Sequence, residues 1–474
     1  MPLIIGAKSA TATGYAVDNS CRFNGGDSPY FASDFSGTGS SSAAIATYSF
    51  WVKLSLEDDR ATLISGKDDT SNYMKIRFAD DGAGWYFGLY GVSPACDLKS
   101  TPIFRDPSAW YNVVMAFDTA QATDTNRIKV WVNGVQITLW STATYLAQND
   151  ELFLTKSNDL EIGAYNNTEH FDGYMAEVVC IDGTALDETS FGEFDEDSPT
   201  IWKPKDVSGL TFGTKGYYLD FEDSAALGAD VSGNSNDFTA TNLDATDQAT
   251  DTSTNNFATM NPLDNYYAEA TFAEGNCKIT SNGTSQAYVM STLGMTTSNW
   301  YWESKIGSSG ALGNYQFGIA ASPSPSAGVG GRLMNASNSV AVDDNDGNVY
   351  ANGSSTGVTV GAFALNDIVN YAYDCSNNAF YIGKNGTWLN SGDPTSGASK
   401  TGAFTPGTAD IPYFPAYGDQ NGTHGYMMEY NFGGCSAFAI SSGNADDNGY
   451  GNFEYDVPTG YYSICTKNLA EFGG

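Results

Sequence analysis

The chain has 474 residues, 41% hydrophobic and 14% aromatic, so it contains enough apolar material for several packed cores. Charged residues make up only 16%, and the 52 glycines accompany many Ser, Thr and Asn residues, which favours short strands joined by turns over helical bundles. With 21 basic and 55 acidic residues the net charge is −34, so we expect no nucleic-acid partner and no binding to acidic lipid.

The first half of the chain alternates apolar and polar residues as half-buried strands do. The predicted strands are 47–54, 85–90 and 110–117. The clearest signal is 128–137, where two alternating runs flank Asn133 and Gly134. This pair is preferred in type I′ hairpin turns because both turn positions need positive φ. A short helix of one or two turns is expected within 185–194.

The middle of the chain has a different composition. Residues 216–221 predict a strand that either completes a first sandwich or begins a small middle element. Residues 225–261 are rich in Ser, Thr, Asn, Asp and Ala, and 244–251 have almost no apolar side chain to bury. We therefore interpret 225–261 as a polar linker or a small middle element.

The second half repeats the construction of the first. A predicted strand at 367–374 precedes an aromatic hairpin at 379–388, which is closed by Asn385 and Gly386. In the first half, the strand that starts at residue 110 precedes the 128–137 hairpin in the same way. The predicted fold class is all-β, with two jelly-roll sandwiches joined by the polar segment.

Several segments resemble known sandwich modules. The segments 19–24, 48–53, 110–114, 130–134, 160–163 and 171–178 resemble the laminin-G-like, concanavalin-like sandwich over about residues 15–200. The segments 300–303, 317–320, 380–388 and 413–417 resemble the SPRY module, another concanavalin-like sandwich. The resemblance implies a laminin-G-like domain at 1–224, the polar segment at 225–261, and a SPRY-like domain with a C-terminal extension at 262–474.

A further set of segments resembles structural proteins of tailed bacteriophages, many of them marine. These segments are 1–6, 230–238, 255–263, 430–433 and 458–469. The resemblance implies a location in the virion, contacts with other virion proteins, and a homo-oligomer, a trimer by analogy. The chain lacks a coiled coil or collagen-like repeat, which favours a compact knob or decoration over a long fibre.

The N-terminus and the hydropathy pattern carry no targeting signal. Residues 1–6 lack a basic stretch and a long apolar core, so we expect no signal peptide and synthesis in the host cytoplasm. No stretch approaches 18 apolar residues, so we expect no membrane insertion.

The seven cysteines form no CxxC pair, so their spacing supports neither a zinc nor a redox site. We expect free buried thiols. Residues 444–449 follow a calcium-loop pattern in part, but Tyr455 stands at position twelve, where the loop needs Glu. Residues 343–347 have Val342 where the first ligand belongs. We assign no metal ligand and no cofactor; the laminin-G resemblance leaves a calcium ion elsewhere open.

Catalysis has to be considered because the concanavalin-like fold also hosts β-glucanases. Those enzymes resemble one another in a Glu-x-Asp-x-x-Glu strand that sets two carboxylates about 5–5.5 Å apart. The nearest match is Glu193 and Asp195, but Ser198 replaces the last carboxylate. A solvated acidic turn is the simpler interpretation.

A second candidate is the serine in residues 353–357, which match G-x-S-x-G. A nucleophile elbow needs a strand, a turn and then a helix, whereas residues 358–361 predict a strand. Only His170 and His424 are available as a histidine base. We assign no catalytic residue and expect that the protein is not an enzyme.

The sequence therefore predicts a virion structural protein, an external appendage of the tail-fibre or receptor-binding type. It would attach to a host surface glycan or protein without catalysis, through loops at the sandwich ends or a concave sheet face. The ligand-binding residues are unknown at this stage. The alternatives are a capsid decoration or head-fibre protein, and a polysaccharide-degrading glycoside hydrolase that uses Glu193 and Asp195.

Overall fold

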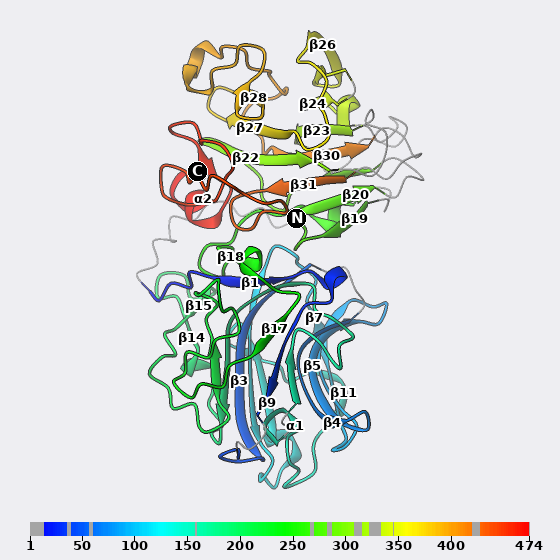
Figure 1. Cartoon of the computed structure of the whole chain (residues 1–474), viewed down its shortest axis with the longest axis vertical. Helices are drawn as coiled ribbons and strands as arrows, with labels where there is room; N and C mark the ends of the chain where they lie inside the picture. Colours follow the sequence, from blue (N-terminus) through cyan, green and yellow to red (C-terminus); the bar gives the residue numbers. More distant parts are fainter. Residues whose placement is uncertain are drawn as a thin grey trace. The chain divides into compact units, whose positions relative to one another are not determined.

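The computed structural model describes residues 14–35, 39–55, 60–156, 159–265, 270–281, 287–307, 315–321, 333–344, 346–419 and 427–473. The chain divides into two compact units, which we call the N-terminal unit (Thr13–Thr254) and the C-terminal unit (Asn255–Gly474) (Figure 1). Both are built from antiparallel sheets, so the all-β, two-sandwich prediction is confirmed.

Helices are short in the described residues. They are α1 (Phe153–Lys156), α2 (Thr466–Phe472) and the 3-10 turns Gly25–Asp27, Asp124–Asn126, Glu188–Ser190, Ala245–Asp247, Pro262–Asp264, Leu333–Asn335 and Pro394–Ser399. The turn at Glu188–Ser190 is the short helix expected within 185–194. Within the described ranges, no helix has the length and apolar character needed to cross a membrane.

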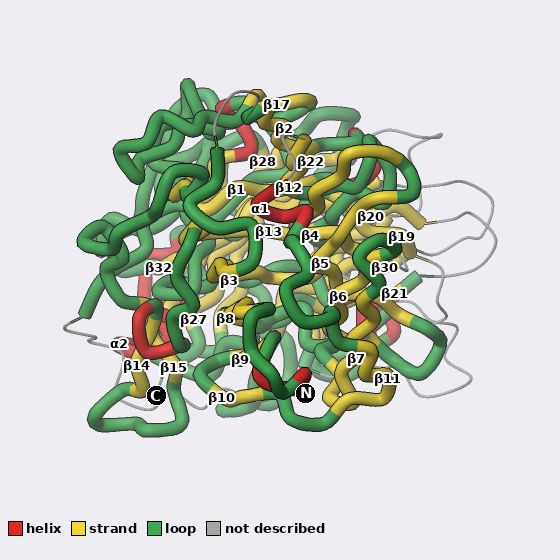
Figure 2. The backbone as a smooth tube through the Cα atoms, turned by 90° about the horizontal axis from the view of Figure 1, so that it is seen from below, coloured by secondary structure: helices red, strands yellow, loops and turns green. Residues whose placement is uncertain are grey.

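The N-terminal unit consists of two large sheets. The first, which we call the β3 sheet, has the order β10 (Val135–Gln136), β9 (Ile128–Val132), β8 (Trp110–Asp118), β3 (Ile45–Leu54), β13 (Gly173–Asp182), β1 (Ser20–Phe23) and β18 (Gln248–Ala249), with β16 (Tyr217–Leu219) also paired to β13. The second, the β5 sheet, has the order β11 (Trp140–Thr144), β7 (Cys96–Ile103), β6 (Trp85–Gly91), β5 (Asn72–Asp80), β4 (Arg60–Asp69), β12 (Asp159–Ile162), β2 (Tyr30–Asp34) and β17 (Thr239–Thr241). Figure 2 shows the two sheets as facing layers.

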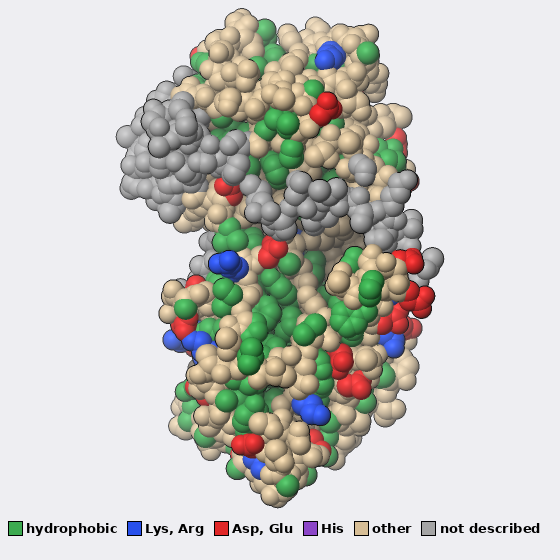
Figure 3. Space-filling model, turned by 180° about the vertical axis from the view of Figure 1, so that it is seen from behind, with side chains coloured by type: hydrophobic (Ala, Val, Ile, Leu, Met, Phe, Trp, Pro, Cys, Tyr) green, Lys and Arg blue, Asp and Glu red, His purple; other side chains and the backbone are tan. Residues whose placement is uncertain are grey.

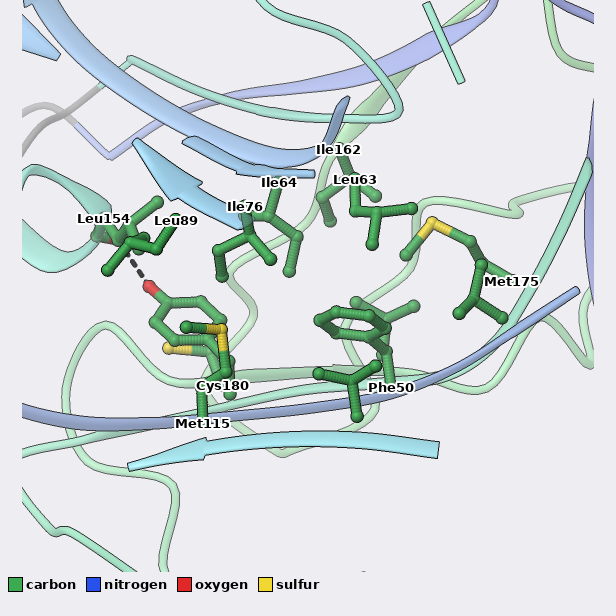
Figure 4. Packing of buried hydrophobic residues seen from close by; sticks show 14 of the residues in the cluster. Phe50, Leu63, Ile64, Ile76, Leu89, Met115, Leu154, Ile162, Met175 and Cys180 are labelled. Atoms are coloured by element: carbon green, nitrogen blue, oxygen red, sulfur yellow. Dashed lines mark hydrogen bonds between the residues drawn. The ribbon is translucent and has the colours of Figure 1, made fainter. Parts of the chain in front are cut away.

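The core of the N-terminal unit lies between these sheets. On β3, Tyr48, Phe50 and Val52 point inward because side chains alternate along a strand, and all are buried. Figure 4 shows Phe50 facing Ile64 and Ile76 of the opposite sheet. The hydroxyl of Tyr48 donates to the carbonyl of Leu154 at 2.6 Å, which satisfies its polar atom inside the core.

The outer face of the β3 sheet is also covered. Val114, Trp131 and Ile181 pack there against Phe191 and other residues of the segment that follows β13. The segment contains the hairpin of β14 (Gly192–Phe194) and β15 (Trp202–Pro204). The indole of Trp202 donates to Oδ1 of Asn112 at 2.9 Å. The central strands of the β3 sheet are therefore buried on both faces, whereas its edge at β9 and β10 carries exposed residues.

The structure corrects the expected linker at 225–261. The boundary between the units lies at Thr254 and Asn255, and the residues before it complete the N-terminal unit. Strand β17 pairs with β2, and β18 pairs with β1. Strand β16 pairs with β13, so the segment 216–221 also completes the first sandwich.

A buried ion pair explains why this polar segment folds back. Nζ of Lys53 lies 2.7 Å from Oδ2 of Asp251, and each side chain is only 2% exposed. The indole of Trp110 donates to Oδ1 of Asp251 at 3.1 Å. A buried charge needs such partners, so Asp251 compensates a cation 198 residues earlier in the chain. Composition alone cannot show a pairing at this distance.

The C-terminal unit is a second sandwich. One sheet, the β22 sheet, has the order β19 (Ala270–Ala273), β20 (Lys278–Ser281), β31 (Met427–Asn431), β22 (Asn299–Ile306), β27 (Ile368–Asp374), β28 (Ala379–Lys384) and β29 (Thr387–Trp388), with β32 (Tyr462–Ser463) parallel to β22. The other has the order β21 (Tyr288–Met290), β30 (Phe414–Asp419), β23 (Tyr315–Ala320), β24 (Ser339–Asp343), β25 (Asn348–Ala351) and β26 (Ser354–Thr359). Trp300, Trp302 and Tyr371 lie in the core between them.

The C-terminal segment after β31 covers the outer face of the β22 sheet. Phe453 and Tyr461 form a buried cluster with Tyr301 of β22. The carboxylate of Glu303 accepts hydrogen bonds from the backbone N–H groups of Glu454 and Tyr455, each at 2.9 Å, and so fixes this segment to the sheet. Burial raises the pKa of Glu303 despite these bonds.

Both predicted hairpins are confirmed. Asn133 and Gly134 have φ of 47° and 74°, and Asn385 and Gly386 have φ of 50° and 77°, as type I′ turns require. All seven cysteines are buried, as predicted. Burial raises the pKa of the Cys96, Cys180 and Cys465 thiols to about 12.

Candidate binding face

The outer face of the β5 sheet carries a cluster of tyrosines and cations. Along β5, Met74, Ile76 and Phe78 point into the core, so alternation turns the residues between them outward. The outward residues of β5, β6 and β7 meet two residues of the loop after β12. We call this set the tyrosine face: Tyr73, Lys75, Arg77, Tyr86, Tyr90, Lys99, Tyr165 and Glu169.

Strand register sets the neighbours on the tyrosine face. Lys75 of β5 lies opposite Tyr90 of β6. Arg77 of β5 and Lys99 of β7 both lie opposite Gly88, which stands between them on β6. Gly88 has no side chain, so the outward side chains of β6 are the rings of Tyr86 and Tyr90, two residues before and after Gly88.

Each cation of the tyrosine face lies near aromatic rings. Nζ of Lys75 is 4.6 Å from the ring centroid of Tyr165 and 5.7 Å from those of Tyr73 and Tyr90. The guanidinium carbon of Arg77 lies 5.1 Å from the Tyr90 centroid. Nζ of Lys99 lies 4.4 Å from the Tyr86 centroid. These distances are within cation–π range, so the rings and cations hold one another in place.

The loop after β12 closes one side of the face. Tyr165 and Thr168 exchange backbone hydrogen bonds at 2.8 and 2.9 Å, and Asn166, Asn167 and Glu169 adopt positive φ. Asparagine tolerates this conformation better than most residues. The tight turn places the Tyr165 ring 4.5 Å from the Tyr73 ring, centroid to centroid.

Glu169 is the carboxylate at the centre of the charged contacts. Its Oε2 accepts from Nζ of Lys75 at 2.6 Å, and its Oε1 accepts from Arg60 at 3.1 Å. Burial opposes ionisation of Glu169, but the hydrogen bond and charge of Lys75 prevail, so the pKa of Glu169 is lowered. Burial lowers the pKa of Lys75 and raises that of Tyr165 to about 12.

This arrangement is suited to binding and not to bond cleavage. Half-buried tyrosine rings offer flat surfaces that stack on the apolar faces of sugar rings, and their hydroxyls, with Arg and Lys, supply polar contacts. The ionised Glu169 is held by two cations, so it is a poor proton donor at neutral pH.

The structure places the predicted catalytic carboxylates elsewhere. Glu193 lies on β14, and Asp195 follows directly after that strand. Nζ of Lys203 lies 3.5 Å from a carboxylate oxygen of each. Backbone hydrogen bonding from Ser198 lowers the pKa of Asp195, the opposite of what a general acid needs. The acidic turn is therefore an ion-paired surface hairpin.

The serine motif does not have the local geometry of a catalytic nucleophile. Ser355 lies in β26, an exposed antiparallel strand, so the strand–turn–helix geometry of a nucleophile elbow is missing at this site. Nδ1 of His170 lies 3.4 Å from the carbonyl oxygen of Pro29. His424 lies outside the described residues.

The first calcium-like loop has a structural role. Asp446 is 6% exposed and accepts from the backbone of Asn448, Tyr450 and Ser463 and from the side chains of Ser463 and Asn468. These donors fill the lone pairs that a cation would need. Asn345, within the second loop at 343–347, lies outside the described residues. In the part of the chain that is described, no group of three or more His, Cys, Asp or Glu residues is placed to hold a metal ion.

A second surface feature lies where strands β10 and β11 end the two sheets. An apolar pocket of about 310 Å³ is lined there by residues that include Pro102, Phe104, Val135 and Leu139. Val135 and Leu139 are 63% and 65% exposed. Figure 3, viewed from behind, shows hydrophobic side chains gathered along the middle of the N-terminal unit.

Sequence reasoning did not identify the tyrosine face. Loops at the sandwich ends or a concave sheet face were expected to bind, but no binding residue was predicted; three of the four tyrosines lie on strands. A signal was available: in 73–78, Tyr, Lys and Arg alternate with Met, Ile and Phe. This alternation predicts that one face of the strand is polar. It does not predict that the neighbouring strand β6 places tyrosines on the same face.

The N-terminal unit contains a region that is similar to concanavalin-like sandwiches. A family model described as the concanavalin A-like lectin/glucanases superfamily matches residues 24–189. This match lies within the region that resembles the laminin-G-like sandwich and confirms that part of the prediction. No curated protein sequence matches the chain.

Solved structures with similar folds have low sequence identity to this chain. The SPRY domain of human HERC1 is 15% identical, with a TM-score of 0.31, and the match covers 38% of this chain and 99% of that structure. A pentraxin from Limulus polyphemus is 14% identical, with a TM-score of 0.28 and coverages of 36% and 78%. Domain 4 of an arabinanase from Geobacillus stearothermophilus, solved with arabinotriose, is 19% identical, with a TM-score of 0.24 and coverages of 32% and 65%.

Proposed function

We propose that this protein binds glycans of a bacterial surface without catalysis, as an external appendage of a phage virion. The observation that carries the binding part is the tyrosine face, where half-buried aromatic rings and cations share the outer side of the β5 sheet. The lectin-type family match over residues 24–189 supports the same kind of ligand. The virion part rests on the resemblance of segments such as 255–263 and 458–469 to phage structural proteins.

The binding part is tested by removing two rings. Tyr73→Ala with Tyr90→Ala removes stacking surface while leaving the inward side chains of β5 and β6 unchanged. We expect binding of the full-length chain to host cells and to their isolated surface polysaccharide to weaken about tenfold or more, since each ring contributes roughly 1 kcal/mol. Binding is measured by fluorescence of the labelled protein.

A matched control is Phe194→Ala, which removes a 41% exposed aromatic ring outside the tyrosine face. Its binding should equal that of the unmodified chain. Equal binding by the double tyrosine variant would contradict the proposal.

The virion role needs its own measurements. We expect the purified chain to compete with phage adsorption, and electron microscopy to locate it on the tail. Density on the capsid without competition would instead support a decoration protein. Release of reducing sugar that Glu193→Gln with Asp195→Asn abolishes would support the hydrolase alternative.

A further inference from the structure

The tyrosine face carries more positive charge than its own carboxylate compensates. Arg60, Lys75 and Arg77 lie on adjacent strands, and the positive charge of each arginine helps to lower the pKa of Lys75. Glu169 forms ion pairs with Arg60 and Lys75. Asp97 of β7 lies opposite Tyr90 on the same face, and Asp81 pairs with Lys99. The cations Arg60, Lys75, Arg77 and Lys99 therefore still exceed the carboxylates Glu169, Asp97 and Asp81, although the whole chain has a net charge of −34.

Arg77 is the cation that the protein leaves uncompensated. Its Nε is buried and has no hydrogen-bond partner among the described residues. Within the same residues its guanidinium forms no ion pair and lies against the ring of Tyr90. The lysines on the same face of the sheet are paired with carboxylates, unlike Arg77. Lys67 pairs with Asp159 and Glu161, and Lys99 pairs with Asp81.

The contact with the Tyr90 ring, 5.1 Å from the guanidinium carbon, restrains the Arg77 side chain beside the tyrosines. A planar guanidinium that is already oriented binds a carboxylate through two parallel hydrogen bonds with little loss of freedom. A neutral sugar would leave the positive charge without a counter-ion. The best ligand therefore combines an apolar ring face for the tyrosines with a carboxylate for Arg77.

Resting on the glycan-binding function proposed above, we propose that the tyrosine face selects acidic saccharides, whose carboxylate pairs with Arg77 while the adjoining sugar ring stacks on a tyrosine. Glycans fit better than acidic peptides because the face offers several tyrosine rings for stacking, whereas peptide binding typically uses a strand edge or a groove for side chains. An acidic peptide is therefore an outcome of the test and not part of the proposal.

The test compares acidic oligosaccharides with their carboxyl-reduced forms, in which each uronate or sialate carboxyl is an alcohol. The probes are oligomers of galacturonic acid, guluronic acid and sialic acid, and binding to the full-length chain is measured by calorimetry. We expect at least one acidic oligomer to bind about tenfold or more tightly than its reduced form, with affinity falling as salt rises.

Arg77→Gln should abolish this preference, so that an acidic oligomer and its reduced form bind with equal affinity. Arg77→Lys keeps the charge but loses the planar fork, so it should retain only part of the preference. Lys129→Gln, which removes an exposed cation from β9 of the other sheet, is the matched control and should behave as the unmodified chain. Thermal unfolding of each variant shows whether it is folded.

The outcomes separate this inference from the proposed function. If every acidic oligomer binds no better than its reduced form, or if Arg77→Gln keeps the preference, the selection of acidic saccharides is wrong even where glycan binding itself holds. If no saccharide binds and the chain captures acidic peptides instead, both proposals are wrong.

Discussion

At the scale of single residues, Glu177 illustrates how a buried polar group inside a sheet is met by hydrogen-bond donors. The residue is in a strained position: it lies at a bulge of β13 with φ of 51° and is 6% exposed. The hydroxyls of Tyr218 and Tyr15 donate to its Oε2 at 2.8 and 3.2 Å. Burial nevertheless raises the pKa of Glu177 from 4.5 to about 7.

Glu177 should make stability depend on pH. Between about pH 4.5 and 7 the folded chain holds this proton while the unfolded chain has released it, so stability falls as pH rises through this window. The difference in pKa corresponds to roughly 3 kcal/mol at most. Glu177→Gln should flatten this dependence and raise the melting temperature above pH 7.

Thermal unfolding at a series of pH values checks this prediction. Glu196→Gln removes an exposed carboxylate of the same unit and should leave the dependence intact. An unchanged slope in Glu177→Gln would show that another group is responsible.

At the scale of elements, local sequence determines the structure of the hairpins more than that of any other element. Asn133 and Gly134 were predicted as a turn from two residues and their flanks, and the turn forms as expected. The structure adds a tertiary reason for the glycine, because the Trp202 ring lies against Gly134, at the place where a Cβ would project. A local rule and a distant contact therefore require the same residue.

Two glycine substitutions separate the contribution of positive φ from that of the contact with Trp202. Gly82→Ala places a side chain at φ of 86° in open space, so only backbone strain of about 1–2 kcal/mol is expected. Gly134→Ala at φ of 74° also overlaps Trp202, which should add about 1–3 kcal/mol. Chemical denaturation measures both; equal losses would mean that Trp202 moves aside freely.

The hairpins and strands could be predicted because their signals are local, whereas two other features could not. Residues 225–254 have a linker-like composition, and their role depends on Lys53, far back in the chain. The tyrosine face depends on which strands become neighbours, since Tyr73 and Tyr90 meet only after β5 and β6 pair. Neither the ion pair with Lys53 nor the pairing of β5 with β6 can be derived from composition or alternation.

At the scale of the whole molecule, the two units have separate cores, and the residue where one ends is itself testable. A fragment of residues 13–254 should unfold cooperatively on heating. A fragment of residues 13–224 lacks β17, β18 and Asp251, and leaves Lys53 buried without its carboxylate, at a cost of about 3–5 kcal/mol.

We expect the shorter fragment to lose the cooperative transition in circular dichroism. Two fragments with the same melting temperature would place the boundary near residue 224 after all.

The distance in sequence between Lys53 and Asp251 also has a consequence for biosynthesis. A ribosome adding about 5–20 residues per second needs roughly 10–40 seconds to translate the 198 residues that separate them. During that interval Asp251 is not yet available to Lys53, and once β13 has been translated and has paired with β1, β1 still lacks its other neighbour, β18. The incomplete edge is then open to pairing with other nascent chains, so we expect the yield of folded protein to depend on chaperones that shield it until translation passes residue 251.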